Sequence, residues 1–236
     1  MNNHPKNETS LRTAALIAGL SILAMVVAAP FAELYVFPKL IVRGSWEETT
    51  KNIIANEALF RTGTFGYLIT FICDLLASWA LYVLLKPVNA SLSLLTAWFR
   101  LVYTVIALVA FTNLVTILKL LNTPDNITAL EPEKFYAQVQ LSITAFKNGW
   151  YFGILFFGIH LGLLGFLVFK SSYIPKLLGV LLMISGLGYL SNGLKPFLFP
   201  NTNIDFAVYT FYGELIFMLW LLIRGHRIRE LNKEIA

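Results

Sequence analysis

The sequence predicts an all-α, polytopic membrane protein, a bundle of six transmembrane helices. Hydrophobic residues make up 57% of the 236-residue chain and charged residues only 13%, whereas about a quarter of the residues of a soluble domain are charged. The mean hydropathy is +0.70. The apolar stretches are each roughly 20 residues long, the length that a helix needs to cross the hydrocarbon core. The lipid bilayer is therefore the expected surroundings of most of the chain.

The apolar stretches define one integral membrane domain over residues 1–236. The first could also be read as a cleaved signal peptide, because Ala29-Pro-Phe-Ala32 resembles a cleavage site. That stretch is too long for a signal peptide and continues past the site, which favours a retained span. The predicted spans cover residues 13–36, 61–85, 91–118, 149–169, 175–197 and 206–223.

Two connections between the spans carry helix signals of their own. Ser45 stands three residues before Glu48, the spacing of a capping box. The residues that follow have amphipathic spacing, which predicts a short interfacial helix before the second span. Glu131-Pro132 resembles a helix start, with proline in the first turn. We expect that helix to continue into the fourth span.

An even number of spans places both termini on the same side of the membrane. The polar segments on that side hold nine Lys and Arg residues, and those on the other side hold eight. The counts alone do not decide the orientation. The nine residues lie in short segments beside span ends, where positive charge has most influence on topology. This distribution favours both termini inside.

Composition and motifs argue against several classes of function. The net charge of +5 is typical of juxtamembrane Lys and Arg, and no basic run with interleaved aromatics predicts a nucleic-acid partner. Cys73 is the single cysteine, and His160 is the only histidine within a span. No zinc-protease, phosphate-loop or serine-hydrolase motif is present. We therefore expect no catalytic residue, no resident metal and no cofactor, and we favour a protein that is not an enzyme.

Four ionisable residues predict a polar layer near the middle of the membrane. Counted from the span ends on the side of the termini, Asp74, Arg100, His160 and Glu214 lie 9 to 12 residues deep. At about 1.5 Å per residue, these depths are roughly 13–18 Å, close to the midplane. Ser185 falls at the same depth. Ionisable residues there are rare and often functional, so the four are candidates for binding a ligand or a proton.

The same layer also has a structural interpretation. With both carboxylates ionised and His160 neutral, the four residues carry a charge of −1, and one added proton neutralises them. Alternatively, Asp74 and Arg100 form a clamp between helices, or Arg100 extends to the interface. A metal held by Asp74, His160 and Glu214 would require three spans to converge. The sequence leaves the functional and structural alternatives open.

Glycines recur at spacings that permit close helix packing. Gly149 and Gly153, and likewise Gly158 and Gly162, are pairs of small residues four apart. In the fifth span, glycines recur every seven residues at positions 179, 186 and 193. Such faces pack helices within one chain or bind another membrane protein.

Several segments, among them Glu57–Gly63, Phe156–Gly165 and Tyr173–Gly179, follow one another in a specific order and spacing. Together they resemble the bacterial membrane-protein family known as domain of unknown function 4386. The family has no established activity, so the resemblance implies a multi-pass protein of the bacterial cell inner membrane and carries over no catalytic residue. Ser45 occupies a position where the family pattern has Asp. The segments are Glu57–Gly63, Lys86–Asn89, Phe99–Arg100, Phe156–Gly165, Tyr173–Gly179, Gly213–Leu215 and Leu221–Gly225.

Two classes of function follow from these observations. The first is a small-molecule or ion carrier, or an intramembrane ligand binder, that uses the polar layer; its ligand is unknown. Sites at this depth are usual in secondary transporters. Six spans without a visible repeat are few for a carrier, which favours a homodimer. The second is an accessory or structural protein that packs against a membrane-protein partner and whose charged layer is only an ion-pair cluster.

Overall fold

The computed structural model describes residues 9–122, 131–199, 201–202 and 210–228. All regular structure in these ranges is helical, which confirms the all-α class. The elements are α1 (Leu11–Pro30), the π-helix η1 (Phe31–Val36), α2 (Phe37–Leu40), α3 (Trp46–Ala55), α4 (Glu57–Leu85), α5 (Ala90–Leu121), α7 (Pro132–Lys170), α8 (Lys176–Leu198), α9 (Tyr212–Arg224) and the 3-10 turn η3 (Gly225–Arg227).

Five helices are long and apolar enough to cross a membrane. They are the continuous helix Leu11–Leu40, α4, α5, α7 and α8, and they correspond to the first five predicted spans. Residues 206–209 of the predicted sixth span lie outside the described residues. The described part of that span is α9, whose 13 residues extend for about 20 Å. That length is less than the roughly 30 Å of a hydrocarbon core, so a six-span bundle is not established.

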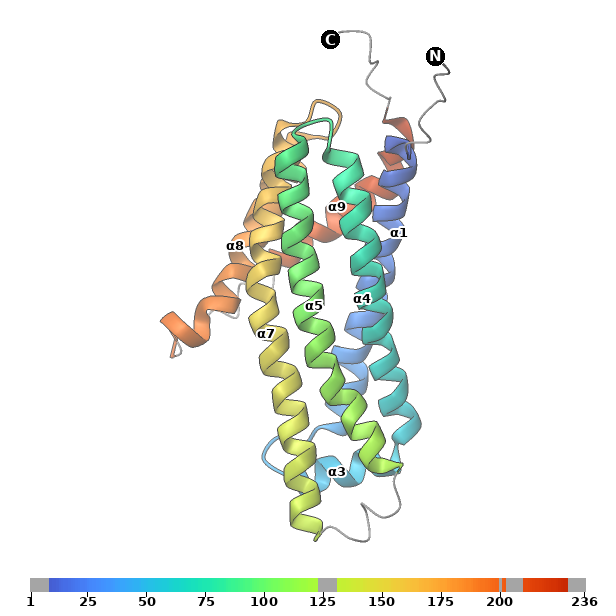
Figure 1. The fold of residues 1–236 in the computed structure, drawn as a ribbon, viewed down its shortest axis with the longest axis vertical. Coiled ribbons are helices and arrows are strands. Elements are labelled where there is room, and N and C mark those ends of the chain that lie inside the picture. Colours follow the sequence, from blue (N-terminus) through green and yellow to red (C-terminus); the bar gives the residue numbers. More distant parts are fainter. Residues whose placement is uncertain (1–8, 123–130, 200, 203–209, 229–236) are drawn as a thin grey trace, which may run out of the picture.

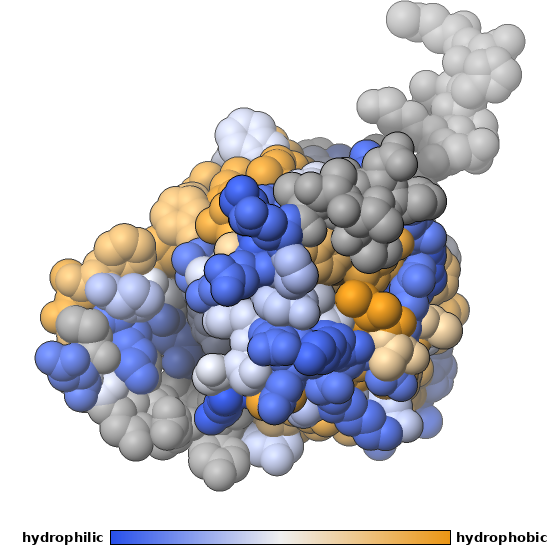
Figure 2. Space-filling view, turned by 90° about the horizontal axis from the view of Figure 1, so that it is seen from below, coloured by the Kyte–Doolittle hydropathy of each residue, from blue (hydrophilic) through white to orange (hydrophobic). Residues whose placement is uncertain are grey.

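The long helices α1, α4, α5 and α7 run side by side (Figure 1). The start of α1, the turn between α4 and α5 and the end of α9 lie at one end of the bundle, which we call the termini end. Helix α3 crosses the opposite end, the α3 end. Helix α8 begins beside α7 at the termini end and then diverges from the bundle. Hydrophilic residues gather over the α3 end, with hydrophobic residues at its periphery (Figure 2).

The first span departs from a regular helix in its second half. Pro30 lies within the helix and has no N–H to donate, which disturbs the hydrogen-bond ladder. The six residues that follow form η1, and the helix continues to Leu40, beyond the predicted end at residue 36. Glu33 lies in η1, and its carboxylate accepts a hydrogen bond from the hydroxyl of Tyr67 on α4.

Helix α3 confirms the predicted short helix before the second span. The hydroxyl of Ser45 accepts the N–H of Glu48 at 3.3 Å, as the capping-box spacing predicts. Thr49, Thr50 and Ile53 are buried. On the exposed side, Lys51 pairs with Glu47 at 2.6 Å, and the carboxylate of Glu47 raises the pKa of Lys51.

Helix α7 has 39 residues and begins at Pro132, as the helix signal at Glu131-Pro132 predicts. Its glycines allow close contact with α8. A Cβ on Gly165 would come within 2.6 Å of the carbonyl oxygen of Gly179, and a Cβ on Gly179 would come equally close to the carbonyl of Gly165. At Gly149 a Cβ would meet Ala110 of α5 at 2.7 Å. These glycine faces therefore pack helices within the chain.

Candidate functional site

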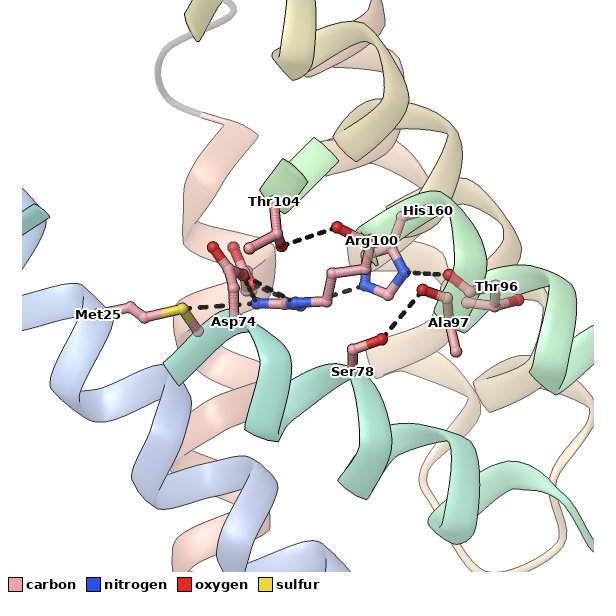
Figure 3. Close-up of polar contacts among 9 residues, drawn as sticks. Met25, Asp74, Ser78, Thr96, Ala97, Arg100, Thr104 and His160 are labelled. Carbon is pink, nitrogen blue, oxygen red and sulfur yellow. Dashed lines mark hydrogen bonds and ion pairs between the residues drawn. The ribbon is translucent and has the colours of Figure 1, made fainter. Parts of the chain in front are cut away.

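Arg100 lies at the centre of the polar layer, where α5 meets α4 (Figure 3). Its side chain is 1% exposed and that of Asp74 on α4 is 2% exposed. The Nε of Arg100 donates to Asp74 Oδ1 at 2.9 Å, and Nη2 lies 2.7 Å from the same oxygen. Arg100 therefore points into the bundle, and the structure shows the ion pair that the common depth of the two residues predicts.

His160 on α7 is fully buried and contacts α5 through both ring nitrogens. Its Nδ1 lies 2.9 Å from the carbonyl oxygen of Thr96. Because a carbonyl only accepts, Nδ1 carries the hydrogen. The Nε2 atom is then the acceptor for Arg100 Nη1, 3.2 Å away. A second proton on His160 would point at the guanidinium, so His160 acts here as a neutral acceptor that positions Arg100.

Glu214 reaches the same guanidinium from α9 but is held more loosely than Asp74. Its Oε1 lies 3.8 Å from Arg100 Nη1, and its side chain is 15% exposed. That separation is an ion-pair contact and is too long for a hydrogen bond. The two carboxylates are therefore unequal: Asp74 is bonded and sealed, whereas Glu214 is near the cation and partly accessible.

Two further groups contact Arg100 that the sequence reasoning did not identify. Nη2 lies 3.7 Å from the sulfur of Met25 on α1, and the guanidinium carbon lies 5.2 Å from the ring centre of Phe157. An apolar methionine gives no signal in a search for ionisable residues. The guanidinium thus contacts side chains from α1, α4, α7 and α9.

Ser185 was expected in this layer, but its hydrogen bonds lie elsewhere. Its hydroxyl is 3.0 Å from the carbonyl oxygen of Leu181 and 2.5 Å from that of Thr210. Ser185 therefore ties α8 to residue 210 rather than binding Arg100. Throughout the described ranges, every buried side-chain nitrogen and oxygen has a hydrogen-bond partner.

Packed aromatic rings fill the bundle between the polar layer and the α3 end. Tyr103 and Phe157 lie one helical turn beyond Arg100 and His160, with ring centres 4.9 Å apart. Trp150 lies 6.3 Å from Tyr103 and 5.2 Å from Tyr67, measured between ring centres. We call the set the aromatic column; its members are Tyr67, Phe71, Tyr103, Phe111, Phe146, Trp150 and Phe157.

A narrow recess lies on the other side of the layer, between α4, α5 and α7. It begins at His160 and extends toward the termini end, and it is too narrow in this conformation to hold a water molecule. We call it the hydroxyl recess because four of its residues carry hydroxyl groups. The lining residues are Ser78, Leu81, Tyr82, Leu85, Ser93, Thr96, Ala97, His160 and Leu164.

The donor groups of the layer do not form a metal centre. Among the residues whose placement is described, no group of three His, Cys, Asp or Glu side chains converges to hold a metal ion. Asp74, His160 and Glu214 instead surround the guanidinium of Arg100. A cation that occupies the centre of the three would compete with Arg100 for the same acceptors.

Comparison with known proteins finds a related sequence. A protein of the archaeon Archaeoglobus fulgidus, named only "Uncharacterized protein", is 36% identical over 165 residues, which cover 70% of this chain and 85% of the relative. No solved structure is similar enough to match. The relative is archaeal, so the bacterial inner membrane that the resemblance implied is not established for this chain.

The family assignment agrees with the fold and with the segments of the sequence. The family described as "Domain of unknown function (DUF4386)" matches residues 17–225, a range that contains all four residues of the polar layer. The five long apolar helices are those of a multi-pass membrane protein. The chain belongs to the DUF4386 family of helical membrane proteins.

Proposed function

We propose that the protein is an ion carrier or intramembrane ligand binder of the cell membrane, and that Asp74, Arg100, His160 and Glu214 form its binding layer. The cargo that suits this layer is a small cation, of which the proton is the simplest. The observation that carries the proposal is the surplus carboxylate. One guanidinium faces two carboxyl groups and a neutral imidazole, so the ionised layer has a charge of −1.

A structural clamp needs only one of the two carboxylates. Asp74 alone neutralises Arg100 and accepts two contacts from it. Glu214 adds a second negative charge at a depth where charge is costly, yet it forms no hydrogen bond with Arg100. A group that is near the cation, partly exposed and weakly held suits reversible binding of a proton or small cation. We assign that role to Glu214. Asp74, Arg100 and His160 together position Glu214.

The test is ion movement across liposomes that contain the purified protein. Liposomes loaded with a pH-sensitive dye report protons, and uptake of radioactive sodium or rubidium reports monovalent cations, each under an imposed membrane potential. Wild-type protein should move at least one of these ions, and Glu214→Gln should abolish the movement. Glu57→Gln is the matched control, because Glu57 is a half-buried carboxylate outside the polar layer, paired with Arg61. Equal flux through wild type and Glu214→Gln would contradict the proposal.

The second candidate function is that of an accessory membrane protein with a structural ion-pair cluster. The sealing of the layer favours it, since Asp74, Arg100 and His160 are between 0% and 2% exposed. Against it, Gly158 and Gly165 of α7 pack on α8 within the chain, which supports the carrier over a partner bound through these two glycines. The two functions differ in one result: a structural cluster predicts no flux of any tested ion by the wild-type protein.

A further inference from the structure

We infer that the hydroxyl recess is a route by which a small cation or a water-borne proton reaches the polar layer from the termini end. The inference rests on the proposed function and specifies its access. It depends on three independent features of the described residues: the chemistry of the recess walls, the position of the recess and the packing on the opposite side of the layer.

The walls of the recess offer hydrogen-bond acceptors. The hydroxyl of Ser78 donates to the carbonyl of Ala97 at 3.0 Å, and that of Ser93 donates to the carbonyl of Tyr82 at 3.0 Å. The hydroxyl of Thr96 donates to the carbonyl of Leu92 at 2.7 Å. Because these hydrogens are committed, each oxygen can only accept from an occupant. Water donating a hydrogen, hydronium or a small bare cation meets that requirement, whereas an anion does not.

The position of the recess links the layer with one end of the bundle. His160 forms its inner boundary and also bonds Arg100. Ser93 lies in the first turn of α5, and Leu85 is the last residue of α4, so the outer boundary lies beside the turn at the termini end. Loading through the recess requires a conformation in which it widens, since it is now narrower than a water molecule.

The aromatic column closes the other side of the layer. Phe157 lies against both Arg100 and His160, and Tyr103 packs on Phe157. Trp150 packs in turn against Tyr103, Phe71 and Phe146. Phe157, Tyr103, Phe71 and Phe146 are each less than 9% exposed. Contacts between such rings present apolar carbon to any ion. The layer is therefore polar toward the termini end and apolar toward the α3 end.

Cysteine accessibility tests the route without any transported ion. In a Cys73→Ser background, Ser78→Cys and Ser93→Cys place thiols in the recess. Ala80→Cys is the matched control, since Ala80 lies on α4, is fully buried and does not line the recess. Two exposed positions mark the sides of the membrane: Lys86→Cys reports from which side the termini end is labelled, and Glu47→Cys reports the same for the α3 end. The reagent is a permanently charged trimethylammonium-ethyl methanethiosulfonate, added to membrane vesicles of either orientation.

Both recess thiols should react from the side that labels Lys86→Cys, with Ser93→Cys the faster because it is nearer the end of the bundle. The cationic reagent should label these thiols about tenfold or more faster than its sulfonate counterpart, because the recess leads to a layer whose ionised groups carry a charge of −1. Labelling of Ser78→Cys no faster than Ala80→Cys, or labelling from the Glu47→Cys side, would overturn the route. Either result concerns access alone, and the liposome flux of Glu214→Gln would still decide the proposed function.

Discussion

Replacement of Arg100 by alanine should destabilise the protein strongly. Arg100 is 1% exposed and contacts Asp74 at 2.7 and 2.9 Å, His160 at 3.2 Å and Glu214 at 3.8 Å. Its removal leaves Asp74 buried without a cation or an alternative donor among the contacts described above. Breaking a buried ion pair by removing one partner costs about 3–5 kcal/mol. We therefore expect Arg100→Ala to lower the free energy of unfolding by roughly that amount.

The assay is unfolding of purified protein by sodium dodecyl sulfate, followed by tryptophan fluorescence. Adding Asp74→Asn and Glu214→Gln to Arg100→Ala should recover part of the loss, because the uncompensated carboxylates are gone. Arg61→Ala is the control, since Arg61 is 49% exposed in its pair with Glu57, and it should unfold like wild type. If Arg100→Ala also unfolds like wild type, or if the triple variant recovers nothing, the reasoning about a buried charge cluster is refuted.

Two further predictions concern the unequal carboxylates and the α7–α8 contact. Glu214→Gln should lower the free energy of unfolding by roughly 1 kcal/mol or less, because the lost contact is long and partly exposed. Asp74→Asn should lower it by about 3–5 kcal/mol. Equal losses in the same unfolding assay would contradict the assigned roles. Gly165→Ala places a Cβ 2.6 Å from the carbonyl of Gly179 and should cost about 1–3 kcal/mol. Gly162→Ala is the control, because a Cβ added at Gly162 meets nothing within 4 Å; it should stabilise the protein by about 0.5–1 kcal/mol. If Gly162→Ala also destabilised the protein, the loss in Gly165→Ala could not be attributed to the close contact with α8.

Hydropathy and helix signals were sufficient for most of the fold. The length of each apolar stretch reflects the thickness of the bilayer, and capping and proline signals act locally, so α3 and the start of α7 were predictable. The irregular end of the first span was not, because a π-helix depends on how η1 packs against α4. The sixth span stays a prediction, because residues 206–209 lie outside the described residues and α9 covers only Tyr212–Arg224.

Depth along each helix predicted the members of the layer, but not their individual contacts. Asp74, Arg100 and His160 converge because their helices run side by side and place them at one depth. The rotation of each helix about its axis decides which side chains meet, and single-sequence hydropathy specifies that rotation poorly. For this reason Ser185, at the right depth, donates to backbone carbonyls and does not contact Arg100. Met25, which the sequence did not predict, contacts Arg100.

The distinct role of Glu214 also required the structure. In the sequence, Asp74 and Glu214 are equivalent carboxyl groups at similar depth, and His160 is an equally good candidate for the titrating group. The carbonyl of Thr96 and the guanidinium together assign the tautomer of His160 and leave Glu214 as the loosely held acid. The aromatic column and the hydroxyl recess likewise arise from three helices and leave no single sequence motif.

Difference infrared spectroscopy of the carboxyl groups tests the central claim most directly. The measurement compares liposome-embedded protein with and without the transported ion, in wild type, Glu214→Gln and Asp74→Asn. The account predicts a carboxyl band that changes when the ion binds, that is absent from Glu214→Gln and that persists in folded Asp74→Asn. A band that survives unchanged in Glu214→Gln would contradict the claim that Glu214 is the exchangeable group of the layer.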